Sequence, residues 1–398
     1  MAEPDGRIPP MKSNRSRLAF VLASVAGILL LTALKGGVLA PPGRDPVLKP
    51  LAIFTEVLNL TRSNYVEQVD TSVLLAGAYD GVTDAIDPFS YYVPGDRMAR
   101  YRAFEASKPL DSGLVLGRRS GYAYVVAPVP GSPAEAGGIK PGDVILAIDG
   151  VSTRNQSLWE IESSVAGPEN SSVALKVLRG GDEREVTVRM TRRRYEATAV
   201  SQKIEDRVPV IRIPYFVPGA AAAVQKLLRA IPSGTPAVIV DVRDSAGGDI
   251  DEAVRTASLF IPAGPVAKVA GKKIPEKSYA TSGDRVWAGK TLVLVDGGTG
   301  GAPEIFAGAL HDRGGADLVG EPTAGMGIVQ RLLPMSSGGA LYLTVGEFVS
   351  PAGTELTGKG LKPTARVDLF PGDSGPSNDL ILKKAVEIAH GASAKAAA

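Results

Sequence analysis

The sequence contains no cysteine, which excludes disulfide bonds, thiol catalysis and cysteine-ligated metal sites. Histidine is almost as scarce, because His311 and His390 are the only two in 398 residues. A cluster of histidine ligands is therefore not expected, and a Ser-His-Asp triad would have to use one of these two rings. We expect no metal and no cofactor, and any hydrolytic chemistry needs another base.

An excess of charge of one sign is also lacking, since 44 Lys and Arg residues stand against 42 Asp and Glu residues. The short basic run Arg192–Arg194 is typical of a solvated strand end rather than of a nucleic-acid footprint. Apolar residues make up 44% of the chain, an ordinary globular composition for two or three domains. Nucleic acid is not an expected partner.

Long apolar runs are limited to Leu18–Leu34, which four basic residues precede. This pattern predicts a cytoplasmic N-terminus over 1–17 and a transmembrane signal-anchor over 18–40. The main body would then be periplasmic or otherwise extracytoplasmic. A cleaved signal peptide is the alternative, because Val38–Ala40 is similar to a small-residue cleavage site. Pro41, directly after that site, disfavours cleavage.

Three textures follow one another after the apolar run. A proline-rich linker and a segment with apolar residues at helical spacing occupy 41–109. Short alternating strands and glycine turns over 110–193, with one amphipathic helix at 158–165, predict a small, mostly β domain. Apolar strands alternating with helices over 194–385 predict an α/β core, a sheet covered by helices. We expect a flexible tail over 386–398.

The run Gly131–Ile145 is the most specific string of the first half, and it resembles a PDZ domain. PDZ domains bind peptides by strand addition, with backbone N–H groups of a glycine loop holding the terminal carboxylate. By this resemblance the carboxylate loop is Gly113, Leu114, Val115 and Leu116. The family usually has a second glycine where Val115 stands, and a β-branched residue resists positive φ.

Strings in the second half resemble the carboxyl-terminal processing, or tail-specific, proteases. They are Asp241–Gly248, Glu304–Asp312, Val319–Thr323 and Gly358–Pro363, with Asn64–Val66 and Ile86–Ser90 upstream. The likeness follows the family's order from about Leu51 to Leu369. It implies a ClpP/crotonase-like α/β protease core with an inserted, mostly-β PDZ domain and an N-terminal helical segment.

The family's chemistry is a serine–lysine dyad, in which a buried, neutral lysine takes the proton of the attacking serine. The family's serine position is Gly301 here, and its lysine position is Met326. Glycine replaces serine at a helix N-cap for about a few tenths of a kcal/mol, and methionine can fill the slot of the lysine stem. By the resemblance, Gln330 matches the residue that orients the lysine, and Gly247 and Gly248 match the turn that binds the oxyanion and substrate backbone.

The resemblance therefore implies a peptide-binding pseudoprotease, acting as a scaffold or regulator. Expected partners are polypeptide C-termini or exported proteins and an active paralogue, and a homo-oligomer is compatible with these features. The alternative is an active serine-type endopeptidase of altered mechanism, with Thr299 as surrogate nucleophile. A third reading takes Val295–Gly301 as a phosphate-cradling loop, although the P-loop spacing and lysine are missing.

Overall fold

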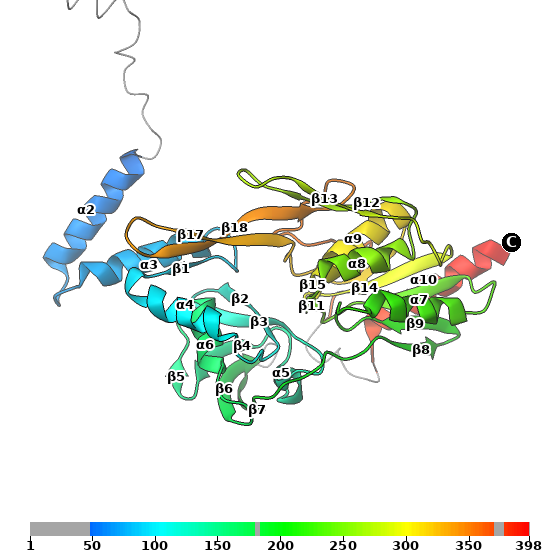
Figure 1. Cartoon of the computed structure of the whole chain (residues 1–398), viewed down its shortest axis with the longest axis horizontal. Coiled ribbons are helices and arrows are strands. Elements are labelled where there is room, and N and C mark those ends of the chain that lie inside the picture. Colours follow the sequence, from blue (N-terminus) through cyan, green and yellow to red (C-terminus); the bar gives the residue numbers. More distant parts are fainter. Residues whose placement is uncertain (1–47, 180–183, 370–377, 398) are drawn as a thin grey trace, which may run out of the picture. The chain divides into compact units, whose positions relative to one another are not determined.

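The computed structural model describes residues 48–179, 184–369 and 378–397 (Figure 1). It divides into two units, one ending at Leu75 and the other beginning at Ala76. Among the residues described, no helix has both the length and the hydropathy of a membrane span. The predicted signal-anchor at 18–40 lies outside the described residues.

The first unit contains helix α2 (Leu48–Asn64) and the start of α3 (Thr71–Asp84). No residue of α2 is buried, and its apolar side chains are exposed. In the second unit α3 ends before Asp87-Pro88, as the proline predicts. Strand β1 (Tyr91–Val93), the 3-10 turn η1 (Gly95–Arg97) and α4 (Met98–Ser107) follow.

The PDZ-like region is an antiparallel sheet in the order β2-β3-β4-β6-β7, with β5 paired to β4. Its elements are β2 (Leu114–Arg119), β3 (Tyr122–Pro128), α5 (Pro133–Ala136), β4 (Val144–Ile148), β5 (Val151–Ser152), α6 (Leu158–Val165), β6 (Ser172–Arg179) and β7 (Arg184–Thr191). The predicted helix at 158–165 is confirmed. Its N-terminus is closed by a capping box, in which Glu160 accepts from the N–H of Ser157. Trp159 and Ile161 of α6 are buried in the core of this region.

The α/β core is built on a sheet in the order β19-β16-β14-β10-β9-β8. Its strands are β8 (Ser201–Glu205), β9 (Val208–Arg212), β10 (Ala237–Asp241), β14 (Lys290–Val295), β16 (Asp317–Gly320) and β19 (Ala365–Arg366), and its helices are α7 (Ala220–Ala230), α8 (Ile250–Ser258), α9 (Ala302–Gly314) and α10 (Leu380–Ala397). All pairs except β8–β9 are parallel. Val238 and Val240 pack with α7, α8 and α9, whereas Ile239 packs with α10. Both faces of the sheet are therefore covered, which explains the continuous apolar strands.

A second sheet of the core joins distant parts of the chain. It contains β1, β18 (Ala340–Val349), β12 (Gly264–Ala270), β13 (Lys277–Thr281) and β17 (Ile328–Pro334). A separate two-stranded pair consists of β11 (Ala246–Gly247) and β15 (Gly300–Gly301), which run parallel. This short pair places the turn formed by Gly247 and Gly248, the paired-glycine turn, beside Gly301, the residue that precedes α9.

The prediction of a flexible tail from residue 386 differs from the structure. Helix α10 continues to Ala397, and Val386 and Ala389 are 8% and 1% exposed. Both pack in the cluster under the sheet with Leu292 and Leu294. The small, alanine-rich composition suggested fraying, but burial of the apolar face stabilises the helix. Residues 386–389 belong to the folded core.

We expect Ala389→Asp to lower the free energy of unfolding by about 3–5 kcal/mol, because it buries an unpaired carboxylate. Lys384→Asp on the exposed face of α10 is the matched control and should shift it by about 0.5 kcal/mol or less. Urea denaturation followed by circular dichroism measures both. Equal stability of the two variants would contradict the docking of this part of α10.

Candidate functional site

Gly301, which the resemblance assigns to the family's serine position, lies against the paired-glycine turn. Gly301 pairs with Gly247 in the β11–β15 register and is the N-cap of α9. Its backbone angles are φ 71° and ψ −120°, which an L side chain rarely adopts. A Cβ placed on Gly301 would lie 3.4 Å from the N and Cα of Gly247. A side chain at 301 would therefore face the turn that the resemblance assigns to oxyanion binding.

Glu304 joins the two dyad positions through its carboxylate. It is fully buried in the first turn of α9. The N–H groups of Gly301, Gly325 and Met326 donate to it at 2.9, 2.7 and 2.7 Å, and the Thr323 hydroxyl donates as well. Burial raises the pKa of Glu304, and these four donors oppose that shift. The carboxylate thus holds the helix start and the loop 323–326 together.

Met326, which the resemblance assigns to the family's lysine position, lies against the residue that precedes Gly301. A Cβ on Gly300 would stand 2.8 Å from the Met326 sulfur, so the thioether packs on the backbone next to Gly301. Gln330 lies on β17, where its amide donates to the carbonyl of Phe89 at 3.0 Å. The structure therefore brings together Gly301, Met326 and Gly247. Gln330 lies on β17, the strand that follows the loop 323–326.

The hydroxyls near the turn are buried. Thr299 is fully buried, and its Oγ1 lies 3.0 Å from both the Val242 carbonyl and the Asp296 carboxylate. Ser245 is also fully buried, and its hydroxyl has no hydrogen-bond partner among the described residues. Neither hydroxyl is paired with a neutral amine or imidazole, and neither is accessible to a peptide.

The phosphate-loop reading requires free backbone N–H groups, and the loop before α9 does not offer them. The N–H groups of Gly298 and Thr299 donate to the Asp296 side chain and carbonyl. That of Gly300 donates to the Ser245 carbonyl, and that of Gly301 to Glu304. These amides are committed within the protein, which argues against a nucleotide site.

Tyr215 is a site residue that the motifs did not reveal. It follows β9, and a Cβ on Gly247 would stand 3.0 Å from its hydroxyl oxygen. Burial raises the pKa of Tyr215, and a hydrogen bond from the Gly248 N–H opposes that shift. The phenol thus lies against the paired-glycine turn. Its place just after the carboxyl end of a parallel strand was the available signal.

The predicted carboxylate loop lies at the start of β2. Gly113 precedes β2 with a φ of 75°, and a Cβ there would lie 2.1 Å from the Ser132 Cβ, so glycine is required. Leu114, Val115 and Leu116 are strand residues, paired with β3 across a bulge. Val115 needs no positive φ, because it belongs to the ladder.

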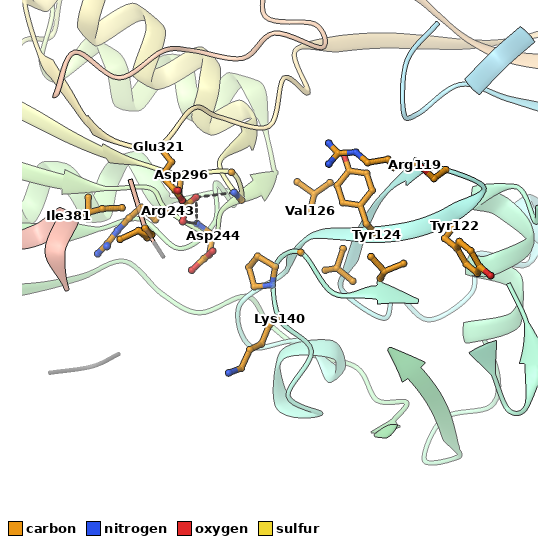
Figure 2. Close-up of a pocket in the computed structure, with 18 residues that line it drawn as sticks. Arg119, Tyr122, Tyr124, Val126, Lys140, Arg243, Asp244, Asp296, Glu321 and Ile381 are labelled. Atoms are coloured by element: carbon orange, nitrogen blue, oxygen red, sulfur yellow. Dashed lines mark hydrogen bonds between the residues drawn. The ribbon is translucent and has the colours of Figure 1, made fainter. Parts of the chain in front are cut away.

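A cavity of about 770 Å³ opens between the PDZ-like region and the core (Figure 2). Tyr124 and Lys140 line it from the first, and Asp244 and Asp296 from the second. The Asp296 carboxylate accepts from the N–H groups of Asp244 and Gly298 at 3.0 Å, as the dashed lines of Figure 2 show. Burial, and then the charge of Asp244, raises the pKa of Asp296 to about 8.

The raised pKa of Asp296 predicts that the stability of the fold depends on pH. Its pKa rises from 3.8 to about 8 on folding, so the native state binds the proton more tightly and this group destabilises the fold as pH rises from about 4 through 8. Asp296→Asn should flatten the decline of the melting temperature between pH 6 and 9. The exposed Asp284→Asn is the control and should keep the native slope. An unchanged slope in Asp296→Asn contradicts the shift.

Gly301→Ser should lower the free energy of unfolding by about 1–3 kcal/mol, because a side chain is strained at this backbone conformation. Gly297→Ser in the same loop is the control, since a Cβ there meets nothing within 4 Å. Denaturant midpoints of the two variants decide the matter. A Gly301→Ser protein as stable as the native chain would contradict the backbone strain expected for a side chain at position 301.

Comparisons with known proteins agree with this architecture. Residues 207–367 match the profile of peptidase family S41, and residues 124–179 match a PDZ domain. The chain is 31% identical over 317 residues to a probable CtpA-like serine protease of Staphylococcus aureus, a match that covers 78% of this chain. The chain spans only 64% of that relative's length.

Two further matches cover more of the compared proteins. A carboxy-terminal-processing protease of Bartonella bacilliformis is 27% identical over 357 residues, covering 87% of this chain and 82% of the relative. The solved photosystem II D1 C-terminal processing protease shares the fold, with a TM-score of 0.61 and 24% identity over 81% of this chain and 93% of its own. Taken with the two domain matches, these likenesses show that the chain belongs to peptidase family S41, among the carboxyl-terminal processing proteases, and carries a PDZ domain.

Proposed function

We propose that this chain is a non-catalytic carboxyl-terminal processing protease homologue that binds polypeptides through its PDZ domain and cleft. One observation carries the proposal. Gly301 and Met326, held side by side around Glu304, present neither a hydroxyl nor an amine where the family's dyad acts. Loss of nucleophile and base together lowers turnover on the order of 10⁶-fold in a serine protease.

The state of the paired-glycine turn supports the same proposal. An oxyanion hole stabilises the transition state through donors that point at free space. Here the Tyr215 hydroxyl lies over Gly247 and near the Gly248 N–H. A peptide bound in the cleft would meet this hydroxyl where the substrate oxygen has to lie. The site is thereby suited to holding a chain rather than to cutting it.

The alternative, a serine-type endopeptidase of altered mechanism, needs a surrogate nucleophile. Thr299 was the candidate, but its hydroxyl is buried and bonded to a backbone carbonyl and to Asp296. The Thr299 side chain is fully enclosed, so no peptide carbonyl can approach its hydroxyl even though Asp296 lies within hydrogen-bonding distance. We therefore favour the binding role.

The cellular setting belongs to the proposal. The apolar run Leu18–Leu34 with its basic flank favours a membrane-anchored chain whose main body lies outside the cytoplasm. Clients would then be the C-termini of exported polypeptides, and regulation of an active paralogue is a second use of the same groove.

The test is a parallel binding and cleavage assay on the detergent-purified full chain. Fluorescent peptides with apolar C-termini should bind, and mass spectrometry should find no cleavage above a protein-free control. Gly301→Ser/Met326→Lys, with and without Tyr215→Phe, reports whether the scaffold supports a restored dyad, and Tyr215→Phe should raise any restored rate by freeing the Gly248 N–H. Native cleavage that Thr299→Ala abolishes would overturn the proposal.

A further inference from the structure

A second cavity, of about 290 Å³, lies along strand β2 and helix α6. Leu114 and Leu116 line it from β2, and Leu158 lines it from α6. Met326 and Ile328 of the core line it as well. The residue at the family's lysine position thus forms part of the wall of the PDZ groove.

Strand β2 offers an edge to an added strand. It is the first strand of the β2-β3-β4-β6-β7 order, and β3 is the only strand of the described residues that pairs with it. At its far end the Arg118 N–H donates to the Pro88 carbonyl, so the edge available to a peptide is the part near Leu114–Leu116. An edge strand presents unpaired N–H and C=O groups, and PDZ domains use such an edge to hold a peptide. Alternate side chains of that peptide point toward the cavity.

The cavity is acidic. Glu105 of α4 and Glu162 of α6 line it, and no lysine or arginine is among its described lining residues. Both carboxylates are accessible, and neither has a hydrogen bond or ion pair to its side chain within the described part of the chain. Asp111 stands nearby, where it accepts from the Gly113 N–H and the Tyr195 hydroxyl. A ligand with a positive charge would meet two unpaired carboxylates.

The electrostatics of Glu162 agree with this geometry. Desolvation, and then the charges of Glu105 and Asp111, together raise the pKa of Glu162 to about 7. The neighbouring phenols of Tyr91, Tyr101 and Tyr342 have raised pKa values too and stay neutral near pH 7. A cation in the cavity would relieve the repulsion among the carboxylates.

We propose that this groove selects peptides that carry a lysine or arginine close to an apolar C-terminus, with the basic side chain in the cavity beside Glu162 and Glu105. The inference rests on the proposed peptide binding and adds the class of peptide. The aliphatic stem of the basic residue packs on Leu114, Leu158 and Met326, and its charged end reaches the carboxylates. Strand addition to β2 fixes the register of that side chain.

The experiment compares labelled hexapeptides that share an apolar C-terminal residue. Each of the four preceding positions carries in turn lysine, norleucine, which lacks only the amine, or glutamate. Fluorescence anisotropy with the full chain should show that lysine at one position binds roughly fivefold tighter than norleucine, and glutamate weaker. This preference should grow from pH 6 to pH 8 as Glu162 loses its proton.

Variants separate the specificity from binding in general. Glu162→Gln should abolish the preference for lysine and its pH dependence, and Glu105→Gln should reduce it. Glu185→Gln is the matched control, because Glu185 is exposed on β7 and does not line the cavity. Norleucine peptides that bind as tightly as lysine peptides would overturn this inference and leave peptide binding intact. Peptides that fail to bind at all would overturn the proposed function as well.

Discussion

The Glu304 carboxylate is the interaction on which the site depends. A fully buried carboxylate is costly unless donors surround it, and here three backbone N–H groups and one hydroxyl do so. Because these donors come from Gly301 and from residues 323–326, one side chain sets the distance between the two dyad positions. All four donors are backbone N–H groups or the Thr323 hydroxyl. The arrangement therefore does not require a hydroxyl at position 301 or an amine at position 326.

The same arrangement explains why glycine and methionine are stable occupants. At Gly301 the positive φ favours glycine, since a serine would be strained there. At Met326 a neutral, flexible side chain packs on Gly300 without requiring a partner. A buried lysine without its serine would need compensation. The local backbone conformation and packing therefore favour the two residues that are present.

The cavity beside β2 and α6 and the loop next to Gly301 share one wall. Met326 lines the groove cavity, and Gly300, on which its sulfur packs, precedes the serine position. Glu162 and Glu105 add negative charge to that cavity from two different helices. A peptide in the groove would therefore contact Met326 directly, which couples the two proposed binding features through one side chain.

Much of this protein was readable from local pattern and motif. Period-two alternation located β3, β6 and β7, helical spacing located α6, and the spacing of strings such as Glu304–Asp312 indicated the family and the altered positions Gly301 and Met326. Other features depend on contacts between segments far apart in the chain. Three features are of this kind. Residues 386–389 pack under the sheet, the Tyr215 hydroxyl lies over the paired-glycine turn, and Glu105 and Glu162 line one cavity. Local propensity is a property of neighbouring residues, whereas burial and charge proximity arise only when the folded chain brings distant residues into contact.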